Sequence, residues 1–319
     1  MQRVIISGLP RSGTSWTGKA LSFAPGFTYY REPDNSDFVP GAPGREHWNL
    51  YLRAGDEHPV YGPHMERALS GKVVNNFVMY DDYGPVVSRI PQPLRFVAEY
   101  CPALYRRQPN ALVKLIRSSL ALEWIAHRFP DARIVSLVRH PIGQFESYRR
   151  QGWERADPAS LLEDDRLVAD HLAPFTDVIR SARDFWERAG AFWGAVNRVV
   201  YRQTQAGGAH SVVPFEWLCA DAPVRMKELS DRLGLGWTSQ SRAFVAPRGA
   251  DADGDPYSLD RDTRAQIDKW RQTVSQRDID ACRAFAEPFG LPVYAGFDPW
   301  QAEPLWSARL SATAAQVMP

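Results

Sequence analysis

A short glycine-bounded loop near the amino terminus constrains this chain most. Residues 4–6 (Val-Ile-Ile) form an apolar run typical of a buried strand, and residues 14–23 have the pattern of a helix. Between them lies Gly8-Leu9-Pro10-Arg11-Ser12-Gly13-Thr14-Ser15, with the glycine spacing of a phosphate-binding loop. Glycines let the backbone fold around an oxyanion, and N–H groups at the helix start point toward it. The sequence therefore predicts an anion site at the first strand–helix junction.

The residue at position 14 distinguishes this loop from the phosphate-binding loop of a nucleoside triphosphatase. Such loops carry a Lys that reaches the β- and γ-phosphates, whereas Thr14 stands at that position here. Arg11 lies inside the loop instead, and Lys19 lies in the helix that follows. This substitution favours a smaller anion, such as a phosphate ester that bears one more group. The alternative is a glycine-rich turn that binds nothing.

Alternating strands and helices predict an α/β fold with a mainly parallel central sheet flanked by helices. The expected strands are 3–8, 27–30, 111–116, 133–138 and 211–215, and the expected helices are 14–23, 118–129, 141 onward, 161–206, 221–233, 260–274 and 276–289. Residues 31–72 are rich in Pro, Gly, Asn and His, and we expect a long binding loop or lid there. We expect a single domain over 1–298 and a loosely attached tail over 299–319.

Composition excludes several classes of protein and leaves the anion site as a local feature. The 319 residues carry 38 Lys and Arg against 37 Asp and Glu, a formal net charge of +1, so no global charge points to nucleic acid. The three cysteines lie far apart, which argues against a disulfide framework or a structural zinc site. We see no metal-ligand set, signal peptide or membrane-spanning run, and expect a soluble cytoplasmic protein.

A second anion element follows the strongest strand of the sequence. Arg139 stands at the carboxyl end of the strand predicted at 133–138, the edge where open α/β sheets bind ligands. Pro141 opens the next helix, and Ser147 lies on the same helical face as His140. Arg139 and Ser147 are therefore expected to hold one phosphate from a strand end and a helix side.

These motifs together resemble the sulfotransferases that use 3′-phosphoadenosine 5′-phosphosulfate (PAPS). Residues 10–16 (Pro-Arg-Ser-Gly-Thr-Ser-Trp) resemble the family's 5′-phosphosulfate loop. Residues 139–147 resemble its 3′-phosphate motif, an Arg-x-Pro stretch with a Ser eight residues after the Arg. Weaker similarities at 129–133, 213–218, 233–235 and 269–271 extend the resemblance over residues 3–290. The resemblance implies the P-loop-like sulfotransferase fold, with PAPS as co-substrate, PAP as product and no metal.

The resemblance also assigns roles to individual residues. The residues that would hold the 5′-phosphosulfate are Arg11, Ser12, Gly13, Thr14 and Ser15, and Trp16 would stack near the adenine. Arg139 and Ser147 would hold the 3′-phosphate, and Arg248 is a weaker match to a further residue on that phosphate. Arg11, with Lys114 or Lys19, would stabilise charge on the leaving phosphate oxygen.

The general base is a separate question, because the cytosolic branch of the family carries Lys-x-His on a strand. This chain has Lys114 but places Ile116 where the His would be. Tyr30-Arg31-Glu32-Pro33 resembles the pattern of the tyrosylprotein and carbohydrate branches, which makes Glu32 the candidate base. His47 and His64 are reserve candidates. The aromatic residues proposed to line an acceptor pocket are Trp48, Tyr51, Phe77 and Tyr80.

The sequence thus predicts a sulfotransferase that moves the sulfuryl group of PAPS to an acceptor, a small molecule or a glycan, at a hydroxyl. We expect the acceptor to be selected by residues 31–100 and about 160–200. The sequence leaves open both the identity of the acceptor and the oligomeric state of the protein. One alternative is a P-loop kinase or NTPase, which would need a Lys at position 14. The other is a non-catalytic nucleotide-binding protein of the same fold.

Overall fold

A parallel five-stranded sheet forms the centre of the protein in the computed structural model, which describes residues 1–37, 39, 41–73, 108–153, 157–246 and 262–311. Its strands are β1 (Arg3–Ser7), β2 (Phe27–Arg31), β3 (Asn110–Leu115), β4 (Arg133–Val138) and β5 (Ala209–Pro214), in the order β2-β3-β1-β4-β5. Each neighbouring pair is parallel. The predicted α/β fold with a mainly parallel sheet is therefore confirmed.

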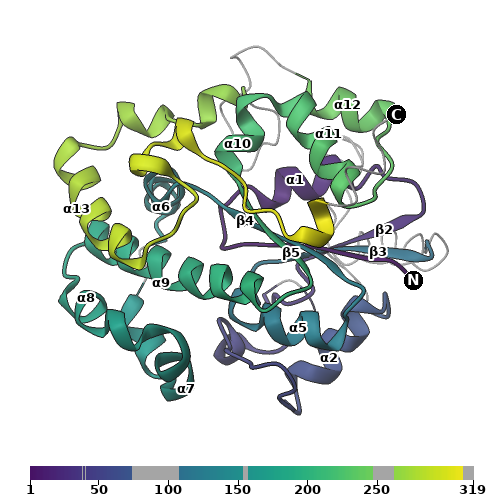
Figure 1. Ribbon diagram of the computed structural model, residues 1–319, viewed down its shortest axis with the longest axis horizontal. Coiled ribbons are helices and arrows are strands. Elements are labelled where there is room, and N and C mark those ends of the chain that lie inside the picture. Colours follow the sequence, from purple (N-terminus) through teal and green to yellow (C-terminus); the bar gives the residue numbers. More distant parts are fainter. Residues whose placement is uncertain (38, 40, 74–107, 154–156, 247–261, 312–319) are drawn as a thin grey trace, which may run out of the picture.

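Helices cover both faces of this sheet (Figure 1). The α-helices of the described residues are α1 (Thr14–Leu21), α2 (Tyr61–Leu69), α5 (Leu122–Arg128), α6 (Pro141–Arg150), α7 (Asp165–Leu167), α8 (Thr176–Ser181), α9 (Phe185–Gln205), α10 (Phe215–Ala220), α11 (Ala222–Arg232), α12 (Ser239–Val245) and α13 (Gln276–Ala286). Helices α1, α10, α11 and α12 contribute to one apolar cluster, whereas α2, α5, α6, α9 and α13 contribute to the other. Parallel strands need such covering helices because their connections cross over the sheet.

The strand sequences explain how the sheet packs against both apolar clusters. In β1, Val4 and Ile6 belong to the cluster on one face, whereas Ile5 belongs to the cluster on the other. All three are fully buried. Successive side chains of a strand point to opposite faces, so an uninterrupted apolar run suits a strand covered on both sides.

The strand order places the ligand-binding edge. The chain leaves β1 toward β2 on one side of the sheet and later reaches β4 on the other side of β1. Such a reversal opens a crevice at the carboxyl ends of the strands. The residues that directly follow the five strands are Gly8, Glu32, Ile116, Arg139 and Phe215. The crevice is therefore bordered by several of the residues that the sequence analysis singled out.

Two segments differ from their predicted secondary structure. The stretch 31–72 was expected to be a loop, yet it contains α2, whose pattern is obscured by Gly62 and Pro63 in its first turn. A Pro there is tolerated because first-turn N–H groups have no intrahelical partner. Within 262–274, the expected helix is instead a pair of 3₁₀ turns, 264–266 and 269–272. This arrangement stacks Trp270 on His140 at 5.2 Å, a tertiary contact that outweighs local helix propensity.

The expectation of a loosely attached tail is wrong for residues 299–311. Leu305 pairs with Val212 of β5 through two backbone hydrogen bonds of 2.8 and 3.0 Å. Trp306 lies edge-on to Trp217 at 5.8 Å, and Leu310 is buried. The polar and proline-rich composition of residues 299–311 does not reveal that these three apolar residues attach the segment to the core. The rest of the segment, 312–319, lies outside the described residues.

Candidate active site

The loop between β1 and α1 is shaped by its two glycines. A Cβ at Gly8 would lie 2.5 Å from the carbonyl oxygen of Leu137 in β4, closer than atoms can approach. Gly13 has φ of 95°, and a Cβ there would lie 2.2 Å from the Phe215 ring. Arg11 also has a positive φ, of 65°, which costs a non-glycine residue about 1–2 kcal/mol. The loop is thus held in a tight curl against the ends of β4 and β5.

Gly13→Ala is expected to destabilise the protein more than the backbone conformation alone would. The positive φ costs about 1–2 kcal/mol, and the collision with Phe215 adds to it. Gly207→Ala is the matched control, because Gly207 has φ of 97° but no atom within 4 Å of an added Cβ. Thermal unfolding of both variants measures the difference. An equal loss of stability in the two variants would show that the loop accommodates a Cβ at Gly13 without a further energetic cost.

The carbonyl groups of the loop bond to partners around it. The Leu9 oxygen accepts from Ser12 N at 3.1 Å, and the Pro10 oxygen accepts from Gln144 Nε2 at 2.9 Å. The Arg11 oxygen accepts from Arg139 Nη1 at 3.2 Å. Helix α1 has no side-chain cap in the described structure, so its first-turn N–H groups are available to an anion. This arrangement suits an oxyanion bound inside the curl.

Arg11, Arg139 and Ser147 meet beside the loop. Arg11 Nε donates to Ser147 Oγ at 2.8 Å, which links the loop to α6. Arg139 is buried, and its guanidinium carbon lies 4.9 Å from the centre of the Phe215 ring. The structure therefore brings together the two anion motifs, which are separated by more than a hundred residues in sequence. Phosphate groups are held well by such converging arginines.

The buried carboxyl group of Glu216 helps to position this cluster. Glu216 accepts hydrogen bonds from His140 N at 3.0 Å and from the Tyr294 hydroxyl at 2.7 Å. Burial raises the pKa of Glu216, although Arg139 opposes that rise. His140 itself stacks on Trp270, its Nε2 lies 3.1 Å from the Phe297 oxygen, and burial lowers its pKa to about 3. Glu216 and His140 thus fix the start of α6, and with it Arg139.

A second cluster joins the loop to the end of β2. Lys114 Nζ of β3 donates to Ser15 Oγ at 2.8 Å and also donates to Glu32 Oε1. Asn35 Nδ2 donates to the other oxygen, Glu32 Oε2, at 2.8 Å. Both side chains are nearly inaccessible to water, with 2% of Lys114 and 8% of Glu32 exposed. The parallel register explains the meeting, since Arg31 is opposite Lys114 in the sheet.

The charge states of this pair follow from their burial and from each other. Burial alone would raise the pKa of Glu32, but Lys114, together with Asn35 and Arg31, more than offsets that effect and lowers the pKa below its ordinary value. Burial lowers the pKa of Lys114, while Glu32 opposes that change. Burial raises the pKa of nearby Asp34 to about 6, even though its carboxylate accepts from Arg117 N and Ser118 Oγ. Glu32 is therefore an ionised carboxylate in a water-poor site.

Other predicted site residues lie as follows. Ser12 Oγ is buried and has no hydrogen-bond partner among the described residues, and Thr14 is also buried. Trp16 is buried edge-on against Phe215 at 6.0 Å. His64 Nε2 lies 2.6 Å from the Pro33 oxygen, and His47 Nδ1 lies 3.0 Å from Glu46 Oε1. Arg248, Phe77 and Tyr80 lie outside the described residues.

Sequence reasoning missed several residues that organise the site. Gln144, Asn35 and Asp34 hold the loop, the Glu32 carboxylate and the end of β3, respectively. Short polar side chains directly after a strand gave a signal for Asp34 and Asn35, because such residues commonly bond to local backbone. Gln144 had a weaker signal, its position on the helical face of Ser147.

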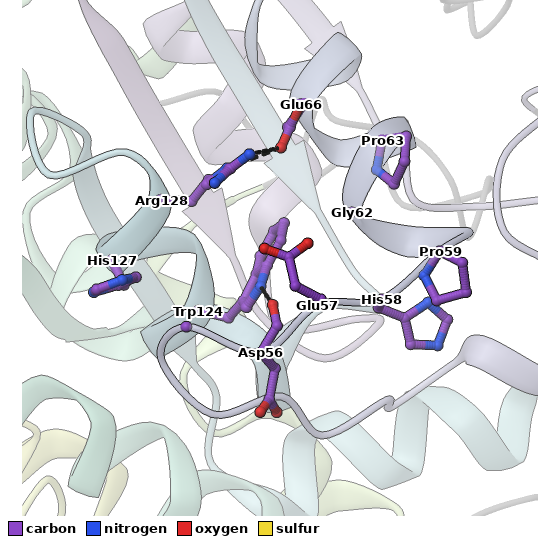
Figure 2. A pocket seen from close by; sticks show the side chains of 11 residues that line it. Asp56, Glu57, His58, Pro59, Gly62, Pro63, Glu66, Trp124, His127 and Arg128 are labelled. Carbon is purple, nitrogen blue, oxygen red and sulfur yellow. Dashed lines mark hydrogen bonds and ion pairs between the residues drawn. The ribbon is translucent and has the colours of Figure 1, made fainter.

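A separate hollow of about 360 Å³ opens between α2 and α5 (Figure 2). It is lined by residues including Asp56, Glu66, Trp124 and Arg128, with an ion pair between Glu66 and Arg128. None of the predicted site residues lines it. The residues that the motifs identify therefore lie apart from this hollow.

The fold and the site together define an α/β protein with a strand–helix loop that suits an oxyanion and a Lys–Glu pair beside it. The model of the sulfotransferase family matches residues 3–239. The chain therefore belongs to the sulfotransferase family and is a PAPS-dependent sulfuryl-transfer enzyme. The resemblance carried by the two anion motifs is thereby confirmed.

Comparison with known structures gives similar proteins of low identity. The sulfotransferase domain of the olefin synthase of Synechococcus PCC 7002 is 21% identical, with 91% of this chain and 95% of that chain covered and a TM-score of 0.45. A sulfotransferase from Alicyclobacillus acidocaldarius is 15% identical, over 90% and 96%, with a TM-score of 0.37. Mouse sulfotransferase SULT7A1 in complex with PAP is 12% identical, over 89% and 82%, with a TM-score of 0.37. No curated protein matches the sequence significantly.

The described residues contain no group of three or more His, Cys, Asp and Glu side chains arranged to hold a metal ion. Among the same residues, no helix combines the length and the apolar character needed to cross a membrane.

Proposed function

We propose that this enzyme transfers the sulfuryl group of PAPS to a hydroxyl group of a small molecule or glycan, with Glu32 as the general base. The observation that carries the proposal is the contact of Lys114 with both Ser15 of the loop and Glu32. It places a carboxylate and a cation directly beside the first turn of the anion-binding helix. Reaction of a loop-bound group at this position would be within reach of both.

The donor side of the crevice fits PAPS in its chemistry. The loop offers first-turn N–H groups and the buried Ser12 hydroxyl, which has no partner among the described residues. We propose that these groups, with Arg11, Thr14 and Ser15, hold the 5′-phosphosulfate. Arg139 and Ser147 would hold the 3′-phosphate, with Arg248 as a further proposed contact and Trp16 near the adenine. The crevice is thus rich in cations although the whole chain is almost neutral.

PAPS supplies an activated sulfuryl group, and PAP is the product that departs. Glu32 would take the proton of the acceptor hydroxyl as its oxygen forms the new bond to sulfur. Lys114 and Arg11 would stabilise the negative charge left on the phosphate oxygen when its bond to sulfur breaks. Positioning and charge stabilisation of this kind provide most of the catalysis in transfers of this type. The buried position of Glu32 removes competing water from the base.

The alternatives make different predictions for this site. A kinase or NTPase would need a Lys where Thr14 stands, so the loop is poorly suited to a triphosphate. A non-catalytic binding protein would have no use for a buried carboxylate and ammonium pair, which is expensive to bury. Cytoplasmic location and the absence of a metal requirement remain predictions from the sequence.

Incubation with PAPS and a panel of phenols, alcohols and sugars tests the proposal. We expect acceptor-dependent release of PAP together with a sulfated product detected by mass spectrometry. No release of PAP across the panel, despite PAP binding, would favour the non-catalytic alternative. Release of PAP without any sulfated product would mean transfer of the sulfuryl group to water and would contradict the proposed acceptor.

A further inference from the structure

Arg117 lies at the mouth of the crevice, two residues beyond β3, and the mechanism does not use it. Its backbone N–H donates to Asp34 Oδ2 at 2.7 Å. Its carbonyl oxygen accepts from Asn49 N at 3.1 Å, and Asn49 has a positive φ of 60°. Arg117 is therefore attached both to the segment that follows Glu32 and to the segment 45–50. Its backbone position is fixed on both sides.

The Arg117 guanidinium lies over an aromatic ring and forms no ion pair with the residues that the structure describes. Its central carbon is 3.5 Å from the centre of the Trp48 ring. Its Nε is buried and has no hydrogen-bond partner within the part of the chain that the structure describes, and Trp48 Nε1 is in the same situation. The residue as a whole is only partly buried. Burial lowers the pKa of Arg117, and the nearby charges of Asp34, Glu32 and Asp37 offset that change only in part.

The carboxylates around Arg117 are already committed to other groups. Asp34 accepts from two backbone N–H groups and from Ser118 Oγ. Glu32 is paired with Lys114, and Asp37 is paired with Arg45 at 2.8 Å. Burying a cation without a partner is unfavourable unless a ligand provides the missing charge. An anionic ligand group at Arg117 would provide it.

We propose that Arg117 and Trp48 recognise an anionic group on the acceptor, so that the acceptor carries a carboxylate, sulfate or phosphate beside the hydroxyl that is sulfated. This inference rests on the proposed function, because it uses Glu32 to mark where the hydroxyl lies. A guanidinium fixed by stacking presents its N–H groups in a plane that matches two oxygens of such an anion. The donor already has Arg11, Arg139 and Lys114 as proposed partners, whereas the backbone N–H of Arg117 is bonded to Asp34, in the segment that follows Glu32.

Three phenols that differ only in their para substituent test this proposal. They are 4-hydroxyphenylacetate, 4-hydroxybenzylphosphonate and the neutral 4-hydroxyphenylacetamide. We expect kcat/KM with PAPS to be about 10- to 100-fold higher for an anion than for the amide. The two anions distinguish a carboxylate site from a phosphate-type site. In Arg117→Gln the preference is expected to fall to near unity, and Arg117→Lys is expected to retain part of it.

The control is Arg45→Gln, which removes a guanidinium that also lies near Trp48, at 5.2 Å, but is paired with Asp37. This variant is expected to keep the preference. Calorimetric binding of the phenols to the PAP-loaded enzyme provides a readout independent of turnover. Equal treatment of anions and amide, binding of none of the three, or an unchanged preference in Arg117→Gln would overturn the proposal. A loss of PAP binding in Arg117→Gln would also overturn it, by moving Arg117 to the donor site, while failure of the wild type to bind PAP would refute the proposed function instead.

Discussion

Glu32→Gln is expected to reduce kcat by about 10²- to 10⁴-fold, the usual contribution of a general base. The amide keeps the size of the side chain and can still accept a hydrogen bond from Lys114, but it cannot take a proton. PAP binding should therefore be unchanged, because Glu32 is not among the proposed donor-binding groups. Steady-state kinetics with PAPS and calorimetry with PAP measure the two effects separately.

Glu66→Gln is the matched control for this substitution. It makes the same chemical change at another ion-paired glutamate, which contacts Arg128 at the hollow between α2 and α5. The control should retain wild-type kcat. If Glu32→Gln retained it as well, the base would have to be sought elsewhere, with His64 and His47 as the first residues to replace. His64 lies close to the segment that follows Glu32, since it contacts the oxygen of Pro33.

Lys114→Met is expected to harm both catalysis and stability. Loss of a group that stabilises developing charge typically costs about 10²- to 10³-fold in kcat. Removal of one partner from a buried ion pair costs about 3–5 kcal/mol, because the other charge is left uncompensated. Arg31 Nε lies 3.8 Å from Glu32 Oε1, too far to replace the direct contact that Lys114 makes. Denaturant unfolding measures the loss of stability.

The pH dependence of stability is expected to change sign in Lys114→Met. In the wild type the pKa of Glu32 is lowered below 4.5, so the pair stabilises the fold above that pH and the effect is lost as the pH falls through the lowered pKa. Without Lys114, we expect burial, the largest single influence on Glu32, to raise its pKa. The variant should then lose stability as the pH rises above the ordinary Glu pKa of about 4.3. Adding Glu32→Gln should restore much of the stability at the higher pH, and no restoration would contradict the paired arrangement.

Much of the fold is predictable because its signals are local. The strand at 133–138 is predicted to the residue, since an apolar and β-branched run between polar turns has few other uses. Helix α2 is missed because Gly62 and Pro63 weaken its local pattern, although packing of Met65 and Leu69 into the core stabilises it. The anchoring of residues 299–311 is missed because it depends on distant partners in β5 and α10.

The site residues likewise fall into those that local motifs predict and those that only the folded structure brings together. Arg11, Arg139 and Ser147 are found from motifs, because phosphate binding imposes fixed residue types at fixed spacing. The pairing of Lys114 with Glu32 joins residues 82 positions apart and depends on the register of β2 against β3, which the sequence does not state. Arg117 is missed because its importance depends on the absence of an ion-pair partner for its side chain among the described residues. Only a folded structure shows which charges are already paired.

Titration of the purified protein with PAP, and separately with ATP and Mg²⁺, tests the central claim most directly. We predict that the wild type binds PAP and not ATP, and that Arg139→Ala weakens PAP binding by at least about 10-fold. Arg128→Ala, which removes an exposed arginine paired with Glu66 away from the crevice, should leave PAP binding unchanged. Tight binding of ATP with no response to PAP would contradict the account and favour a kinase or NTPase.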